Sequence, residues 1–192
     1  MALTEPVRSK RHIREMANFY LQQGKTRNYL LIVMGVYTGL RISDLLSLTR
    51  FEVYDYVCGC FRSHIHLVEQ KTGKSKTIAL NKTVVAALAL YFKAQSGKAE
   101  DYLFQSGRRA HSPIGRTQAW RIVKDAAAAV GLFHGVGCHS LRKSLGYHAW
   151  KSGVQAVLLM DIYNHSSFAV TKRYLGITQD ERDSVYLGLA LM

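Results

Sequence analysis

The spacing of apolar residues along the first fifty positions predicts three helices. Over residues 10–23 they recur at intervals of three and four, which is the repeat of one helix face. Residues 27–37 are apolar nearly all round, so a second helix there is expected to be buried. The pair Thr38-Gly39 interrupts it, and a short third helix is expected over residues 41–48.

The pattern then changes to that of strands. Segments 51–56, 61–69 and 76–80 are rich in Val, Ile, Tyr, Phe and Thr, the residues that strands favour. The sequence Lys71-Thr72-Gly73-Lys74 lies between the last two, with glycine where a hairpin turn requires positive φ. We therefore predict a small three-stranded antiparallel β-sheet.

Helical patterns resume after the strands. Asn81 is expected to cap a helix that runs to about residue 95, and Ser112-Pro113 is expected to open another that ends near Gly131. Three shorter helices are expected over 140–151, 154–163 and 167–174. Thr178 and Glu181 form a capping box for a last helix over 178–192. The predicted fold class is therefore mainly α with one small three-stranded antiparallel β-sheet.

Length and composition are those of one globular domain. The chain has 192 residues, of which 48% are hydrophobic, enough to bury a core and too many for a disordered chain. We predict a single domain over residues 1–192, with a flexible basic N-terminus over 1–9 and the C-terminal helix over 178–192.

Charge points to a polyanionic partner. Lys and Arg number 26 against 13 Asp and Glu, a formal net charge of +13. Such an excess favours nucleic acid first and an acidic membrane surface second. The longest apolar stretch, residues 29–37, is about half of what a membrane span requires, and the N-terminus lacks the pattern of a secretory signal. Three cysteines form no disulfide framework. We expect a cytoplasmic protein with no membrane partner.

Several cations stand where they could bind a phosphate. His139 and Arg142 are three residues apart, so the start of a helix would place both on one face. Arg41 opens another predicted helix, and Lys71 lies on the hairpin, where it could serve as a mobile general acid. The alternatives are an ordinary surface helix, an exposed Arg41–Asp44 ion pair and a solvated turn.

Tyr174 is the candidate nucleophile. A free tyrosine has a pKa of about 10 and is a poor nucleophile, so nearby positive charge has to stabilise its phenolate. His165 stands nine residues earlier, directly before a predicted helix start. One nucleophile, two arginines and several proton or hydrogen-bond donors would suit attack on a phosphodiester without a metal ion.

Taken in order, these residues resemble the tyrosine recombinase (phage integrase) family. The resemblance rests on Thr38-Gly39-Leu40-Arg41, on His139-Ser140-Leu141-Arg142 and on the nine-residue interval from histidine to tyrosine, and it extends from about residue 10 to the C-terminus. It implies the fold of the family's catalytic domain. It also implies six catalytic residues, which are Arg41, Lys71, His139, Arg142, His165 and Tyr174.

The same resemblance implies a reaction and partners. Tyr174 would attack a phosphate of double-stranded DNA and form a 3′-phosphotyrosyl bond, with no cofactor or metal ion. Strand exchange would require a tetramer on DNA, held together by the C-terminal helix, with accessory DNA-bending proteins as a further class of partner. The family implies a nucleoid-associated protein encoded by a bacterium, a phage or a mobile element.

Two departures from the family pattern stand out. Before the histidine the family usually has Leu-Gly-His, whereas this chain has Tyr163-Asn164-His165. Asparagine is the next-best residue for a left-handed turn, so the backbone is expected to be preserved. Most members also carry a DNA-binding domain before the catalytic domain. Here we expect no separate N-terminal core-binding domain, as in a short recombinase similar to the fimbrial invertases or in a truncated integrase.

Two other interpretations remain beside the recombinase. A type IB topoisomerase-like enzyme would share the tyrosine chemistry but religate the same strand. A DNA-binding regulator or a catalytically inactive remnant would bind DNA without cutting it. Zinc binding by Cys58, Cys60, His64 and His66 is disfavoured, because their spacing is more simply that of alternate strand positions and no paired C-x-x-C occurs.

Overall fold

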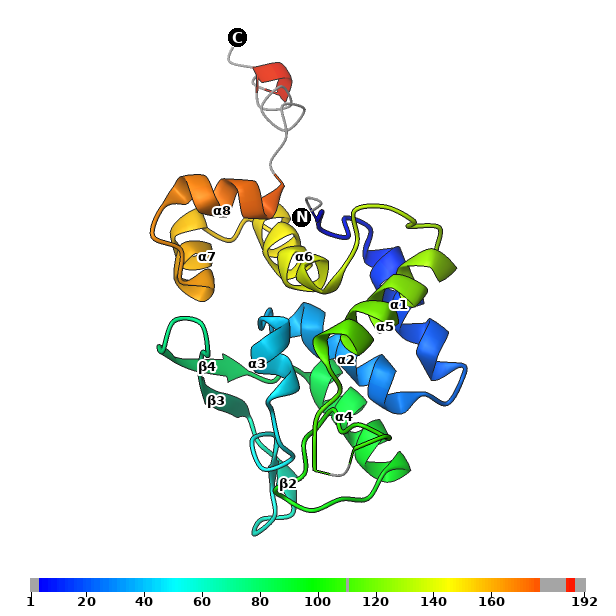
Figure 1. The fold of residues 1–192 in the computed structure, drawn as a ribbon. Helices are drawn as coiled ribbons and strands as arrows, with labels where there is room; N and C mark the ends of the chain where they lie inside the picture. Colours follow the sequence, from blue (N-terminus) through cyan, green and yellow to red (C-terminus); the bar gives the residue numbers. More distant parts are fainter. Residues whose placement is uncertain (1–3, 110, 177–185, 189–192) are drawn as a thin grey trace. The chain divides into compact units, whose positions relative to one another are not determined.

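A computed structural model describes residues 4–109, 111–176 and 186–188. The chain divides into two compact units, residues 1–145 and 146–192. In order, the elements of the described residues (Figure 1) are α1 Lys10–Leu21, α2 Thr26–Tyr37, α3 Ile42–Leu46, β1 Tyr54–Asp55, β2 Cys60–Phe61, β3 His64–Val68, β4 Ser75–Ala79, α4 Lys82–Ala94, α5 Arg116–Ala129, α6 Cys138–Lys151, α7 Ala156–Tyr163 and α8 Phe168–Leu175.

The core of the first unit is built around α2. Every residue of α2 from Leu30 to Val36 is buried, and the helix packs against α1 and α4. An apolar helix has no face for water, so it takes the central position that the sequence predicted. Gly35 lets the start of α6 approach closely, since a Cβ there would lie 2.6 Å from a methyl group of Leu141. The prediction of a mainly α fold is confirmed.

The prediction of one three-stranded sheet is wrong. The described strands form two separate antiparallel pairs, β1 with β2 and β3 with β4. The segment predicted as one strand over 61–69 is interrupted at Arg62 and Ser63. Phe61 pairs with Tyr54 on the preceding strand, whereas residues from His64 onward pair with the following strand, β4. β-Propensity identified the strand residues but could not reveal that the pairing partner changes.

One helix start was predicted correctly and one was not. The Asn81 side chain accepts a hydrogen bond from the Val84 amide at 3.0 Å and caps α4 as expected. Helix α5 begins only at Arg116, after Gly115, instead of at Ser112-Pro113. Residues 112–114 hydrogen-bond residues 104–106 instead, with Ile114 N donating to Phe104 O at 2.8 Å, and these contacts are incompatible with a helix.

The N-terminal segment is tied to the start of α6. The Val7 amide donates to Ser144 Oγ at 2.8 Å, and Lys143 Nζ donates to Thr4 O at 2.6 Å. The Glu5 amide bonds Gly135 O at 2.7 Å. Val7 is buried. Residues 4–9 therefore have defined contacts in the first unit, while the flexible basic N-terminus over 1–9 and the single domain over 1–192 stay predictions.

In the second unit, α7 and α8 pack side by side (Figure 1). Their contact buries Leu159, Tyr163, Thr171 and Leu175. The helix predicted over 178–192 lies outside the described residues except for 186–188, which are helical. None of the helices that the structure describes is long and apolar enough to cross a membrane.

Candidate active site

Arg142 is a buried arginine on the second turn of α6. Its side chain is 1% exposed, and its Nη1 donates to the carbonyl oxygen of Gly39 at 2.5 Å. Gly39 adopts φ +58°, and a Cβ there would lie 2.6 Å from Leu145 Cδ2, so only glycine fits. His139 lies three residues earlier on the same helix and is exposed. The glycine of Thr38-Gly39-Leu40-Arg41 therefore fixes the arginine of the distant His139–Arg142 motif.

Arg41 is held by two buried carboxylates. It is the N-cap residue of α3, and its Nη1 lies 2.7 Å from Glu69 Oε2 and 4.0 Å from Asp44 Oδ2. The side chains of Glu69 and Asp44 are 0% and 1% exposed. The alternative of an exposed Arg41–Asp44 pair is thus wrong. Buried charges must be paired, so the two carboxylates hold the guanidinium of Arg41 in a fixed position.

Lys76 on β4 adds a third cation that the sequence reasoning missed. Its Nζ lies 3.9 Å from Glu69 Oε1, and its side chain is 12% exposed. Burial, followed by the positive charge of Arg142, lowers the pKa of Lys76 to about 8, while the carboxylate of Glu69 opposes this shift. Lys76 therefore lies within electrostatic reach of both arginines. The available signal was the alternation along β4, which makes Lys76 and Ile78 the half-buried positions.

Lys71 lies in the turn between β3 and β4 and is exposed. The turn is the predicted hairpin, with Gly73 at φ +66°. Its base is fixed to the arginine cluster, because the Gln70 amide donates to Asp44 Oδ1 at 3.0 Å. The structure thus anchors the backbone directly before Lys71 and leaves the lysine side chain at the surface.

The second unit holds the candidate nucleophile in a cluster of three rings. The centroids of His165 and Tyr174 are 4.8 Å apart, edge to face, and Tyr163 stacks on His165 at 5.3 Å. The Nδ1 of His165 lies 3.0 Å from Thr171 Oγ1, which orients the imidazole. Asn164 adopts φ 56° and ψ 42°, so the expected left-handed turn is confirmed.

Tyr163, which stands where the family usually has leucine, is the buried floor of this cluster. It is 0% exposed, and its centroid lies 4.9 Å from that of Tyr174. Gly146 on α6 makes room for the larger ring, since a Cβ there would lie 2.6 Å from the Tyr163 hydroxyl and 2.9 Å from Leu175 Cδ2. The departure from the family pattern is therefore accommodated by local packing.

Two sets of groups with complementary chemistry result. The first unit brings Arg41 and Arg142 to one cluster with the hairpin base and Lys76, and this cluster is the candidate site for an anion. The second unit brings the imidazole of His165 against the phenol of Tyr174. Nucleophilic attack on a phosphodiester uses both kinds of group, a nucleophile and cations that stabilise the charge on the phosphate oxygens.

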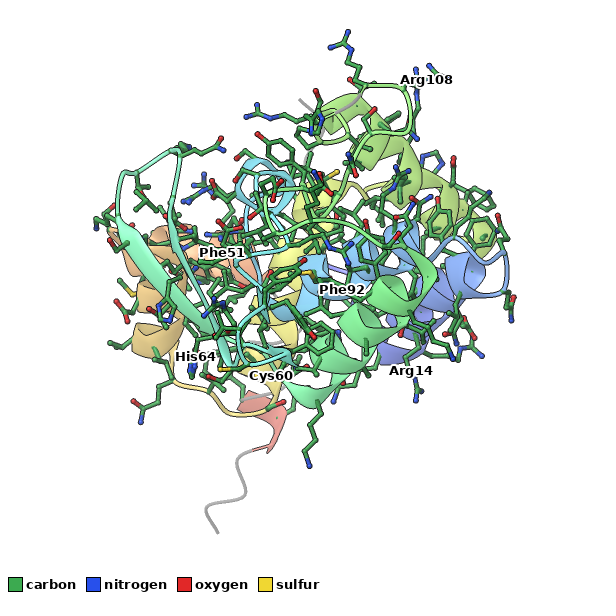
Figure 2. The ribbon with its side chains drawn as sticks, turned by 90° about the horizontal axis from the view of Figure 1, so that it is seen from below. Arg14, Phe51, Cys60, His64, Phe92 and Arg108 are labelled. Carbon is green, nitrogen blue, oxygen red and sulfur yellow. The ribbon has the colours of Figure 1, made fainter. Side chains whose placement is uncertain are left out.

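The other features singled out in the sequence do not gather into a site. Cys58, Cys60, His64 and His66 are all exposed; Figure 2 shows Cys60 and His64 at the surface. Within the described ranges, no three His, Cys, Asp or Glu side chains are grouped so that they could hold a metal ion.

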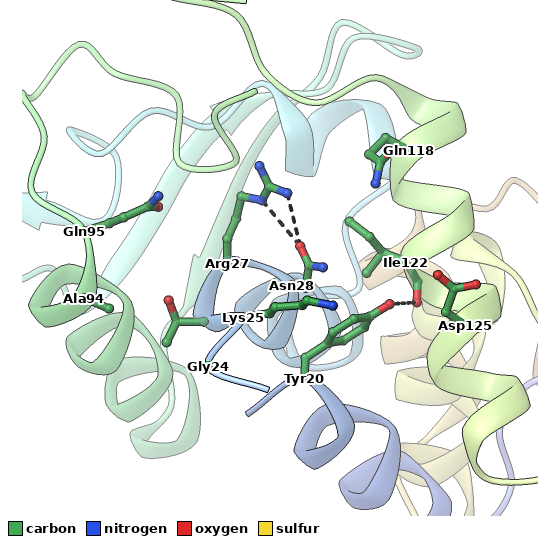
Figure 3. Close-up of a pocket in the computed structure, with 11 residues that line it drawn as sticks. Tyr20, Gly24, Lys25, Arg27, Asn28, Ala94, Gln95, Gln118, Ile122 and Asp125 are labelled. Atoms are coloured by element: carbon green, nitrogen blue, oxygen red, sulfur yellow. Dashed lines mark hydrogen bonds between the residues drawn. The ribbon is translucent and has the colours of Figure 1, made fainter. Parts of the chain in front are cut away.

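A cavity of about 550 Å³ lies elsewhere in the first unit, between the α1–α2 turn, the end of α4 and α5 (Figure 3). Its polar groups have local partners: Tyr20 donates to Ile122 O at 2.8 Å and Arg27 to Gln105 O at 2.7 Å. None of the six candidate residues lines it.

The fold is that of the catalytic domain of a tyrosine recombinase. The crystal structure of XerA recombinase matches with a TM-score of 0.75 at 22% identity, over 96% of this chain and 65% of that one. A lambda integrase dimer bound to a COC′ core site matches with a TM-score of 0.69 at 18% identity, over 95% of this chain and 50% of that one.

Residues 9–181 match the Phage integrase family. The "Probable integrase/recombinase YoeC" of Bacillus subtilis (strain 168) is 37% identical over 186 residues, which are 97% of this chain and 97% of that protein. The chain belongs to the phage integrase family of tyrosine recombinases. It spans only 45–53% of the length of several other curated recombinases that it matches.

Proposed function

We propose that this protein is a site-specific DNA recombinase that cuts and rejoins DNA through Tyr174. The observation that carries the proposal is the pair of arginines, Arg41 and Arg142, fixed by buried partners in a chain of this family. Side chains held in this way are preorganised to bind charge that develops on a phosphate. Retention of their anchors argues against an inactive remnant.

In the proposed cleavage, the Tyr174 oxygen forms a bond to the scissile phosphorus while the bond to the 5′ oxygen breaks. His139 accepts the phenol proton as general base, and Lys71 gives a proton to the leaving 5′ oxygen. Arg41 and Arg142 bind the non-bridging oxygens, and His165 donates a hydrogen bond to one of them. The 3′-phosphotyrosyl bond conserves the energy of the broken bond, so a second 5′-hydroxyl can reverse the reaction on a new strand.

Double-stranded DNA is the proposed partner. The formal charge of +13 favours contact with phosphates, which supply most of the affinity in such complexes. Basic side chains are spread over the first unit: Arg14 and Arg108 point outwards on different sides in Figure 2. We place the protein in the cytoplasm, associated with the nucleoid.

A two-site plasmid assay tests the function. Plasmids that carry two copies of the native site should yield recombinant products in EDTA, without ATP. Relaxation of supercoiled plasmid that lacks the site, with no recombinants, would instead support the topoisomerase alternative. DNA binding without either product would support a non-catalytic regulator.

We further propose that the protein forms a tetramer on DNA through its C-terminal helix. Tyr186 and Leu187, in the described part of that segment, are 78% and 87% exposed, and Val157 and Leu158 on α7 are 74% and 52% exposed. These exposed apolar side chains support the proposal, because a neighbouring protomer would remove them from water.

Deletion of residues 185–192 should abolish the tetramer on DNA while leaving cleavage of a single site intact. The reason is that cleavage depends on the six candidate residues, whereas assembly depends on the apolar C-terminal segment. Native gel electrophoresis of the protein–DNA complexes, with thermal unfolding as the control, measures both. If the truncated protein is unfolded, the segment belongs to the protomer's own core and the docking proposal fails.

A further inference from the structure

Glu69 is a fully buried carboxylate at the centre of the cation cluster. It follows the last residue of β3 and is 0% exposed. Its Oε2 lies 2.7 Å from Arg41 Nη1 and accepts a hydrogen bond from Thr72 Oγ1 at 2.7 Å. Its Oε1 lies 3.9 Å from Lys76 Nζ. A carboxylate here lowers the positive charge available to a phosphate, so charge attraction alone does not account for its place in an anion-binding site.

The contacts of Glu69 join three elements. Arg41 is the N-cap of α3, Lys76 lies on β4, and Thr72 lies in the turn between β3 and β4. The backbone of Glu69 also closes that turn: its amide bonds Lys74 O at 2.9 Å, and its carbonyl accepts from the Gly73 amide at 2.8 Å.

Lys71 lies between Glu69 and Thr72, the two residues that this side-chain hydrogen bond links. Glu69 stands two residues before it, and Thr72 directly follows it. The same carboxylate oxygen contacts both Arg41 and Thr72. A displacement of the turn therefore has to disturb the Arg41–Glu69 pair, and the reverse also holds.

We infer that Glu69 is a positioning residue, which ties Arg41 to the β3–β4 turn so that a phosphate bound by the arginine meets the proton donor of the turn. The inference rests on the proposed function, in which Lys71 protonates the leaving 5′ oxygen. Glu69 itself touches neither the phosphate nor the leaving group in this scheme.

A substrate that needs no proton on its leaving group tests this coupling. In a nicked suicide duplex, the bridging 5′ oxygen of the scissile phosphate is replaced by sulfur. A thiolate is a much weaker base than an alkoxide and departs without a general acid. Single-turnover rates of covalent adduct formation are then compared on the oxygen and sulfur substrates.

Glu69→Gln keeps the shape of the side chain and its capacity to accept a hydrogen bond from Thr72, but removes the charge. We expect it to slow cleavage of the oxygen substrate by about 10–100-fold and to recover most of that loss on the sulfur substrate, since loss of a general acid alone costs about 100-fold or more. Equal slowing on both substrates, or no slowing, would overturn the inference.

Three further variants separate the outcomes. Lys71→Ala should be slow on oxygen and rescued by sulfur; if it is not rescued, the proposed role of Lys71 fails independently of Glu69. Thr72→Val breaks the link at an exposed position without leaving a buried charge unpaired, and should show the same oxygen-specific defect if Glu69→Gln does not fold. Glu52→Gln is the matched control, because Glu52 also accepts from a threonine, Thr49, outside the cluster, and it should match wild type.

Discussion

Replacement of Tyr174 by phenylalanine is expected to abolish the covalent protein–DNA adduct while leaving DNA binding intact. Phenylalanine retains the ring that packs against Tyr163 and His165, so the three-ring cluster should persist. It lacks the oxygen that would bond to phosphorus in the proposed reaction. The loss should therefore be complete to the limit of detection, the largest effect that any single substitution here should produce.

The measurement uses a nicked suicide duplex with the native site, incubated in EDTA and resolved on a denaturing gel. Wild type should give an SDS-resistant adduct and Tyr174→Phe none. Tyr56→Phe is the control, because Tyr56 is a partly exposed tyrosine that is not one of the candidate site residues. Its hydroxyl accepts a hydrogen bond from Arg50 Nε. An adduct from Tyr174→Phe would mean that another tyrosine is the nucleophile. Its absence from wild type as well, despite good binding, would favour a non-catalytic DNA-binding protein.

The parts of the fold that follow from local pattern were predictable. The all-apolar sequence of α2 indicated a buried helix, and Asn81 and Gly73 marked a cap and a turn, because each depends on neighbouring residues only. The strand pairing was not predictable in the same way. Phe61 and His64 lie in one β-rich run, but Phe61 pairs with an earlier strand and His64 with a later one. Strand propensity contains no information about the pairing partner.

The site shows the same division. The order of the motifs pointed to Arg41 and Arg142, but an exposed Arg41–Asp44 pair stayed open as an alternative. The structure places Arg41 beside two buried carboxylates. Glu69 escaped notice because its importance comes from contacts with Thr72 in the turn, with Lys76 on β4 and with Arg41, 28 positions earlier. A strand-end glutamate is ordinarily solvated, and only three-dimensional packing removes it from water.

Arg142→Lys is expected to reduce the rate of adduct formation by about 10²–10³-fold with little change in the stability of the fold. Arg142 is 1% exposed and already uses Nη1 on the Gly39 carbonyl. The planar guanidinium can keep that bond and still present other N–H groups to a phosphate oxygen, whereas the single ammonium of lysine has to choose between them. Loss of one preorganised donor to a developing oxyanion costs about this factor.

Single-turnover kinetics on the suicide duplex, with thermal unfolding in parallel, separates catalysis from folding. Arg142→Ala should lose activity and also stability, because the buried Gly39 carbonyl loses its partner at a cost of about 1–3 kcal/mol. Arg11→Lys is the matched control: Arg11 is exposed on α1 and pairs only loosely with Glu15, at 3.6 Å, so the same exchange should leave the rate unchanged. If Arg142→Lys has wild-type kinetics, the phosphate requires only the positive charge and not the planar guanidinium held by the Gly39 carbonyl.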